Sequence, residues 1–184
     1  MKLSSRLWSN MELKKFTDKI TGSVVNVSAG SDKDKYGLKY QQYFNKAKSY
    51  TTTNFKLRGK ELKLDLTQPA PENLIKKFDV VFNHSTLEHV ENYKLAFKNL
   101  CDISKDMVIL VVPAVHVKHT SDTFGDYTRF PESLVQELFK ENNYRIGYIS
   151  STPPKYQYKT EKQSIFVFAI AQRIETFNEE FYGK

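Results

Sequence analysis

FDVVFNHSTLEHV, residues 78–90, and MVILVVP, residues 107–113, are two apolar runs that each end in an abrupt change of composition. Short runs rich in Val, Ile and Phe are typical of strands that are buried on both faces of a parallel sheet. The segment between them carries the apolar spacing of one helix face, at Tyr93, Ala96, Phe97 and Leu100. A strand, a helix and a second strand predict a βαβ unit at the centre of an α/β sheet.

The chain before this unit carries a helix pattern and three strand-like runs. Ser9 and Glu12 have capping-box spacing, and the apolar positions after them predict a helix over about 9–21 that Gly22 ends. The apolar run 23–27 predicts a buried strand that stops at a tight turn. The other elements expected here are a short helix with a loop over 33–49, strands over 49–54 and 61–66, and a short helix over 71–77.

The chain after the central unit ends in two consecutive strands. Pro131 opens a further helix, and apolar runs at 145–150 and 164–171 follow it. Two strands without an intervening helix pair antiparallel. We therefore expect a mostly parallel sheet with one antiparallel strand near the C-terminus and helices on both faces. Residues 1–184 would form one domain, with a core over about 23–171 and a short C-terminal tail.

Composition narrows the class of protein. The 28 Lys and Arg residues and the 21 Asp and Glu residues give a net charge of +7. Such a balance favours an anionic partner such as nucleic acid, although lysines spread along the chain are also typical of a solvated surface. A single cysteine excludes an internal disulfide, and the sequence has neither an apolar signal-peptide core nor a membrane-length apolar run. We expect a cytoplasmic protein with no membrane partner.

The predicted topology locates the ligand site before any motif is considered. In open α/β sheets, ligands bind outside the carboxyl ends of the strands. The segments that follow those ends are 28–32, 54–55, 65–67, 83–89 and 113–130.

Motifs in these segments resemble those of one enzyme family. FDVV at 78–81 is followed by STLEHV at 85–90, then by a helix and an apolar strand that ends in Pro113. DYTRF at 126–130 is similar to an Asp-Tyr-x-Arg-Phe element that precedes the next helix. In this order and spacing, the motifs resemble those of class I S-adenosylmethionine-dependent methyltransferases, in the broad group that includes ubiquinone-biosynthesis O-methyltransferases. The resemblance covers about residues 23–171 and implies a Rossmann-like sheet and S-adenosylmethionine as cofactor.

The first turn departs from the family pattern of an acid followed by Gly-x-Gly-x-Gly. Asn26, Ser28, Gly30 and Asp32 occupy the matching positions. The resemblance nevertheless implies cofactor contacts along the strand ends, at Ser28, Ala29, Gly30, Asn54, Asp65, Leu66, Asn83 and His84. The alternative roles are an ordinary turn at Gly30, a loop cap at Asp65 and a turn-forming amide at Asn83.

All four histidines, His84, His89, His116 and His119, follow the two central strands. We expect them to converge in one crevice, with His89, His116 and Glu88 as candidate acid-base groups for a hydroxyl acceptor. Glu88 as a helix cap with His89 packed beside it is the alternative. Some metal-dependent relatives, such as plant small-RNA 2′-O-methyltransferases, use a Glu-x-x-Glu-His run to hold a divalent ion. Ser85 replaces the first Glu of that run, so a metal site of Glu88, His89 and His119 is the less favoured reading.

Two aromatic and basic segments have both a binding and a packing interpretation. Arg129 suits an anionic acceptor, but a salt bridge and packing before the next helix are the favoured explanation. Tyr36, Tyr40 and Tyr43 suit stacking on nucleic acid or sugar, but their spacing also fits packing on the sheet. The sequence thus predicts methyl transfer to a hydroxyl of a glycan, nucleotide or small molecule. A catalytically inactive scaffold on the same fold, which the altered turn would explain, is the alternative.

Overall fold

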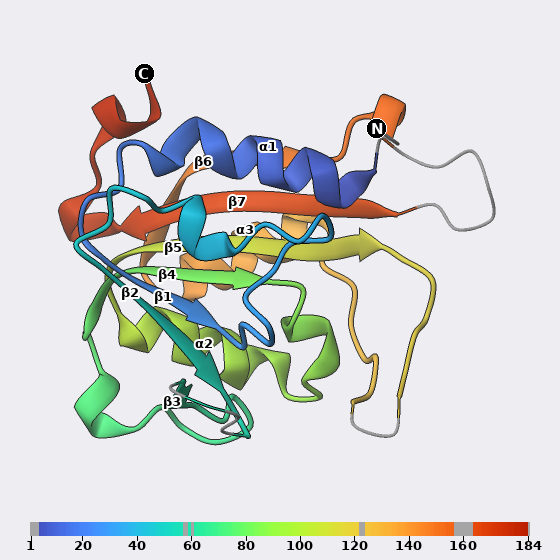
Figure 1. The fold of residues 1–184 in the computed structure, drawn as a ribbon, viewed down its shortest axis with the longest axis horizontal. Helices are drawn as coiled ribbons and strands as arrows, with labels where there is room; N and C mark the ends of the chain where they lie inside the picture. Colours follow the sequence, from blue (N-terminus) through green and yellow to red (C-terminus); the bar gives the residue numbers. More distant parts are fainter. Residues whose placement is uncertain (1–3, 57–58, 60, 122–123, 157–163, 184) are drawn as a thin grey trace.

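The computed structural model describes residues 4–56, 59, 61–121, 124–156 and 164–183. These residues form a seven-stranded sheet in the order β3-β2-β1-β4-β5-β7-β6 (Figure 1). All neighbouring pairs from β3 to β5 are parallel, and β7 runs antiparallel to both β5 and β6. The mostly parallel sheet with one antiparallel strand is therefore confirmed. The strands are β1 Ser23–Val27, β2 Ser49–Asn54, β3 Leu62–Lys63, β4 Phe78–His84, β5 Ser104–Val115, β6 Tyr144–Ser151 and β7 Ile165–Arg173.

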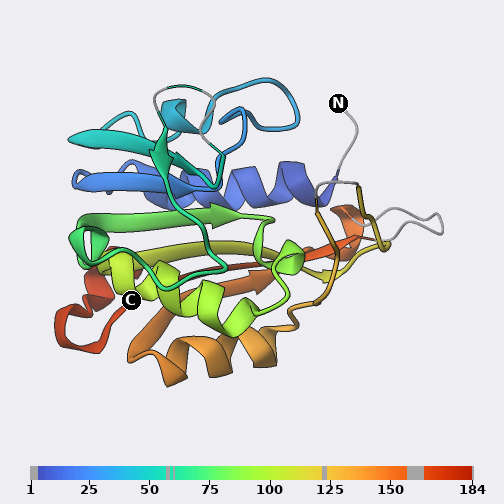
Figure 2. The ribbon, with the colours of Figure 1, turned by 90° about the horizontal axis from the view of Figure 1, so that it is seen from below.

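Helices cover both faces of the sheet, as expected. Helix α1, Ser5–Thr17, packs on one face, where Trp8, Leu13 and Phe16 join a core with alternate side chains of the central strands. Helices α2, Tyr93–Ile103, and α3, Glu132–Glu141, pack on the other face (Figure 2). No helix in the described part of the chain is both long and apolar enough to span a membrane.

The expected bounds of the first helix were wrong by one turn. Helix α1 begins after Ser4, whose hydroxyl accepts a hydrogen bond from the backbone N–H of Leu7 at 3.2 Å. The proposed capping box does not form, because Ser9 lies inside the helix and Glu12 bonds to Lys15 and to the Tyr148 hydroxyl. Tertiary contacts with His84 and Tyr148 thus occupy the Ser9 and Glu12 side chains, whose spacing suggested a cap.

Three short elements also differ from what the sequence predicts. Segment 33–49 contains only a 3₁₀ turn at Tyr40–Gln42, because the Asp34 carboxylate accepts from two backbone amides and holds the chain in a loop. The expected strand over 61–66 pairs only at Leu62–Lys63. Segment 71–77 forms a 3₁₀ turn at Glu72–Leu74, after which the next backbone amides donate to the end of α2.

The carboxyl ends of the central strands meet at one edge of the sheet. There the side-chain amide of Asn83 donates to the Val27 carbonyl at 3.0 Å and so joins the end of β4 to the end of β1. The long segment after β5 returns across this edge, where the Phe130 N–H donates to the Pro113 carbonyl at 2.8 Å. The turn after β1, the segment after β4 and the segment after β5 are therefore neighbours.

Candidate functional site

The turn after β1 has the backbone of a glycine-rich turn with only one glycine. Ser28, Gly30 and Asp32 have φ angles of 58°, 57° and 54°. These are the three positions at which the resemblance implies glycines, and the left-handed region is one that glycine adopts at least cost. Two non-glycine residues of this turn thus adopt backbone angles that favour glycine.

Side chains hold this turn in place. The Ser28 and Ala29 amides donate to the hydroxyl and the carbonyl of Thr53, near the end of β2. The Asp32 carboxylate accepts from the Tyr50 hydroxyl at 2.6 Å and the Asn26 amide at 2.9 Å. The turn is open at Gly30, with nothing within 4 Å of the position a Cβ would take. A pocket of about 630 Å³ lies beside it, lined by Gly30, Ser31, Asp32, Lys39, Gln41, Tyr50, Thr51, Thr52 and Glu61.

The remaining residues predicted to contact the cofactor differ in whether their polar atoms already form hydrogen bonds within the protein. Asn54 accepts from the following amide, and Asp65 caps a turn by accepting from Thr67 at 2.7 and 2.9 Å. Leu66 is buried in the core, and its carbonyl accepts from Asn99. Asn83 differs, because its fully buried Oδ1 has no hydrogen-bond partner among the described residues. An orphaned buried oxygen is rare and indicates a position for a missing donor.

His84 ends β4 as a neutral, fixed imidazole. Its Nε2 lies 3.1 Å from the Ser9 hydroxyl on α1, and its Nδ1 lies 3.0 Å from the Ser85 hydroxyl. Burial, with a smaller contribution from Arg6, lowers the pKa of His84 to about 3. His84 therefore joins α1 to the strand end and does not exchange protons near neutral pH.

Glu88 and His89 form a pair on a 3₁₀ turn, Leu87–His89, directly after β4. The Nε2 of His89 lies 3.9 Å from the Oε1 of Glu88. The other ring nitrogen, Nδ1, lies 2.6 Å from the Gly125 carbonyl, which can only accept, so Nδ1 carries the proton and Nε2 presents its lone pair. Burial raises the pKa of Glu88 to about 7 and lowers the pKa of His89.

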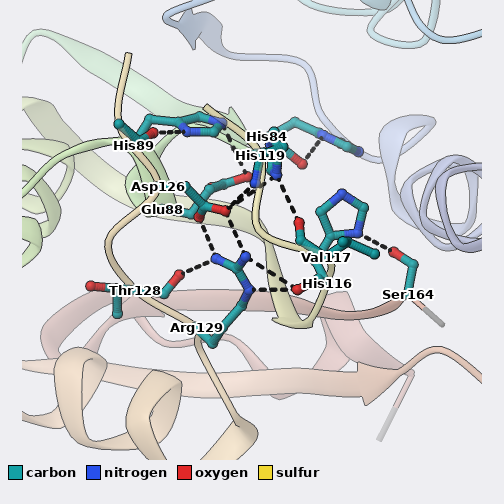
Figure 3. Close-up of polar contacts among 12 residues, drawn as sticks. His84, Glu88, His89, His116, Val117, His119, Asp126, Thr128, Arg129 and Ser164 are labelled. Carbon is teal, nitrogen blue, oxygen red and sulfur yellow. Dashed lines mark hydrogen bonds and ion pairs between the residues drawn. The ribbon is translucent and has the colours of Figure 1, made fainter. Parts of the chain in front are cut away.

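The prediction that all four histidines converge holds for three of them. The ring centroids of His89 and His119 lie 4.8 Å apart, and those of His119 and His116 lie 4.9 Å apart (Figure 3). His116 is fixed through Nδ1, 3.0 Å from the Ser164 hydroxyl, and burial lowers its pKa. His84 stands to one side of this cluster and shares the Phe166 ring with His116.

Arg129 and Asp126 build the segment that carries His116 and His119 (Figure 3). The guanidinium donates to both oxygens of the fully buried Asp126 carboxylate and to the carbonyls of His116 and Thr128. Those contacts use all five N–H groups that an arginine has. Arg129 is therefore a structural residue and has no donor left for an anionic acceptor.

The geometry of this site does not support the alternative of a bound metal ion. Within the described ranges, no group of three or more His, Cys, Asp or Glu side chains is arranged to hold an ion. The Nδ1 of His119 instead lies 3.1 Å from the Val117 carbonyl.

The tyrosines of segment 33–49 are mainly core residues. Tyr40 and Tyr43 are buried, and the Tyr40 ring lies 5.1 Å from that of Phe82 in β4. Only Tyr36 is exposed. Packing on the sheet, and not a stacking surface for nucleic acid, explains this spacing.

Arg6 lies at this site, although the sequence did not predict it there. It lies in the first turn of α1, with its Cζ 5.8 Å from the centroid of the Phe166 ring. No local motif marks it, because only the packing of α1 across β7 brings it to the strand ends (Figure 1).

Several solved structures that share this fold are methyltransferases. A 1,6-didemethyltoxoflavin-N1-methyltransferase from Burkholderia thailandensis, with bound 1,6-didemethyltoxoflavin and S-adenosylhomocysteine, matches with a TM-score of 0.66 at 12% identity, over 92% of this chain and 78% of that one. An S-adenosylmethionine-dependent methyltransferase from Clostridium acetobutylicum matches with a TM-score of 0.61 at 10% identity, over 93% and 92%. A magnesium protoporphyrin IX methyltransferase from Synechocystis with bound S-adenosylhomocysteine gives 0.59 at 10%, over 91% and 83%.

The sequence itself matches no protein-family model and no curated protein. Identities of 10–12% establish shared architecture and leave the acceptor open. The chain has the fold of the class I S-adenosylmethionine-dependent methyltransferases.

Proposed function

We propose that this protein binds S-adenosylmethionine at the carboxyl ends of β1, β2 and β4 and transfers its methyl group to a hydroxyl held beside Glu88 and His89. The observation that carries the proposal is the turn after β1, which keeps left-handed backbone at Ser28, Gly30 and Asp32. Such backbone is costly for Ser and Asp, and strain of this kind concentrates at functional sites.

The residues at the strand ends fit this cofactor in two places. Gly30 is exposed with open space above it, which permits a ligand to approach the backbone closely. The orphaned Oδ1 of Asn83 could accept a hydrogen bond from an ammonium group such as that of the methionine moiety. Asn54 and Asp65 support the fit less, since each already bonds to its own loop.

The Glu88–His89 pair would receive the acceptor's proton. S-adenosylmethionine, when bound, supplies an electrophilic methyl group. Transfer of that methyl group to the acceptor oxygen would break its bond to the sulfonium sulfur and release S-adenosylhomocysteine, and the hydroxyl proton would pass to the lone pair on His89 Nε2. Gly125 fixes the ring by accepting from Nδ1–H, and Glu88, 3.9 Å from Nε2, stabilises the resulting imidazolium when ionised.

An inactive scaffold is the rival function, and one observation favours it. The Asp32 carboxylate is bonded into the turn by Tyr50 and Asn26, so the turn is complete without a ligand. In that case the altered motif serves only the fold.

Melting curves with S-adenosylhomocysteine separate the two functions. A ligand that binds only the native state raises the melting temperature by mass action, so the wild type should melt higher with the ligand than without it. Gly30→Val should abolish the shift, because a β-branched side chain would fill the open space above the turn. No shift for the wild type at saturating ligand would support the scaffold.

Gly37→Val is the matched control. Gly37 also has a positive φ, 90°, and nothing lies within 4 Å of its Cβ position, but it belongs to the loop before Tyr40. Both substitutions introduce the same kind of backbone strain. A shift lost in both variants would indicate general destabilisation, whereas a shift lost only in Gly30→Val would indicate a cofactor contact.

A further inference from the structure

Among the described residues, Arg6 is a cation at the site with no partner of opposite charge. It is half-buried in the first turn of α1. The contact found for its guanidinium is the Phe166 ring, 5.8 Å away, and it forms no hydrogen bond or ion pair within the described ranges. A partly desolvated guanidinium has five donors in a planar fork, a geometry that matches a carboxylate or a phosphate.

The Phe166 ring places Arg6 beside the histidines. Phe166 lies 6.1 Å from the His84 ring and 6.0 Å from the His116 ring, measured between centroids. The field of Arg6 reaches three site residues: it lowers the pKa of His84 and of His116, and it opposes the burial that raises the pKa of Glu88. Arg6 is thus electrostatically coupled to the groups that would handle the acceptor's proton.

On the side of Glu88 and His116, the other charges near Arg6 are balanced; Asp34 and Asp32, which act with Arg6 on the Tyr40 hydroxyl, lie in the segment before Tyr40. Asp126 is neutralised by Arg129 in a bidentate pair, and His84 is neutral. The pKa of Glu88 is about 7, so this carboxyl group is only partly ionised near neutral pH. The site therefore carries a surplus positive charge on the side of β5 and β7.

We propose that the methyl acceptor is an anion whose carboxylate or phosphate group binds the Arg6 guanidinium, while its hydroxyl faces Glu88 and His89. This proposal rests on the proposed function, because it specifies the substrate class of the same site.

The sheet order indicates that this anion belongs to the acceptor and not to the cofactor. Phe166 begins β7, which is separated from β1 by β4 and β5. Three strand spacings of about 4.8 Å put β7 about 14 Å from β1, beyond the turn that would hold the cofactor's carboxylate.

Calorimetric titration with small probes tests the proposal. The probes are phenyl phosphate and 4-hydroxybenzoate, with phenol and 4-hydroxybenzamide as their neutral counterparts, and each is titrated with and without S-adenosylhomocysteine. We expect the wild type to bind the anionic probes more tightly than the neutral ones. Arg6→Gln should weaken the anionic probes about tenfold or more, as loss of a charge-assisted bidentate contact does, and leave the neutral probes unchanged.

Lys14→Gln is the matched control, since it removes one positive charge from the same helix. Lys14 is exposed, with its Nζ 5.2 Å from the Tyr43 ring. If both variants weaken the anionic probes equally, only net charge matters and the proposal fails. Arg6→Lys, which keeps the charge without the planar fork, should give an intermediate affinity and separates loss of contact from loss of folding.

The titrations also distinguish failure here from failure of the proposed function. If S-adenosylhomocysteine binds the wild type while the anionic probes bind no better than the neutral ones, the anionic acceptor is wrong and the methyltransferase function stands. If Arg6→Gln weakens S-adenosylhomocysteine and leaves the anionic probes unchanged, Arg6 serves the cofactor and the proposal is overturned. If the anionic probes bind through Arg6 but S-adenosylhomocysteine does not bind, the anion site stands and methyl transfer fails.

Discussion

The Oε1 of Glu88 lies 3.9 Å from the Nε2 of His89, although the two residues are adjacent in sequence on a tight turn. Glu88 is only 2% exposed, and its Oε2 has no hydrogen-bond partner among the described residues. Burial without a hydrogen-bond partner disfavours the charged form of a carboxyl group. Burial therefore raises the pKa of Glu88 to about 7. The fold thus tolerates an acid that is half-ionised near neutral pH.

Glu88→Gln should flatten the pH dependence of stability. Glu88 binds its proton more tightly in the folded chain than in the unfolded one, where its pKa is 4.5. Its contribution is therefore full below pH 4.5 and is lost as the pH rises through about 7. Relative to Glu88→Gln, the wild type should lose about 3 kcal/mol of unfolding free energy over this range, as measured by urea denaturation at a series of pH values.

Glu91→Gln provides the comparison, because Glu91 is an exposed acid on the same segment. Its pH profile should parallel that of the wild type. Parallel profiles for wild type and Glu88→Gln would show instead that folding leaves the pKa of Glu88 unchanged, so that Glu88 is ionised and has no role as a proton acceptor near pH 7.

Arg129→Met should destabilise the segment that carries His116 and His119. It would leave the fully buried Asp126 carboxylate without its partner, and breaking a buried ion pair on one side costs about 3–5 kcal/mol. Amide hydrogen exchange should rise at His119, whose N–H donates to Asp126, and at Tyr127, whose N–H donates to the Glu88 carbonyl.

Arg145→Met is the surface counterpart. Arg145 pairs with Glu179 at 2.9 Å, but both side chains are more than half exposed. Solvent screens such pairs, so the change should cost less than about 1 kcal/mol. Equal losses in the two variants would mean that Asp126 is solvated and that Arg129 does not organise the site.

The mostly parallel sheet and its antiparallel strand follow from periodicity that the sequence displays, because FDVVF and MVILVV have few alternatives to a buried strand. The start of α1 and the short 3₁₀ turns do not follow from such local patterns. The capping-box spacing of Ser9 and Glu12 was overridden when His84 and Tyr148 bound those side chains. Local patterns lose to tertiary contacts where the local free energies are small.

The residues of the site likewise divide into those that the sequence predicts and those that it does not. The convergence of His89, His116 and His119 could be predicted, since loops that leave adjacent parallel strands at one edge are neighbours. Arg6 could not, because its position depends on how α1 lies across β7. For Arg129 the sequence favoured the structural role, and the contacts of all its N–H groups agree with it.

His84 should not titrate between pH 5 and pH 8, since burial lowers its pKa to about 3. Its C2 proton in the NMR spectrum, assigned by its loss in His84→Gln, should keep a constant shift over that range. The unfolded chain binds this proton more readily, with a pKa of 6.5, so His84 also makes stability fall as the pH drops below that value. A His84 signal that moves with a midpoint near 6.5 would show that the imidazole is solvated and that its bonds to Ser9 and Ser85 are not maintained.

Restoring glycines to the turn after β1 should have different effects at its two altered positions. Ser28→Gly relieves left-handed strain of about 1 kcal/mol but adds comparable freedom to the unfolded chain, so the unfolding free energy should change little. Asp32→Gly relieves the same strain but removes the acceptor of the Tyr50 hydroxyl and the Asn26 amide, which should cost about 2 kcal/mol. Urea unfolding of the two variants and of Tyr50→Phe measures the balance, and Asp32→Gly should cost little further in the Tyr50→Phe background if that bond carries the effect. If Asp32→Gly instead stabilises the protein, the aspartate is a strained departure from the glycine pattern and does not hold the turn.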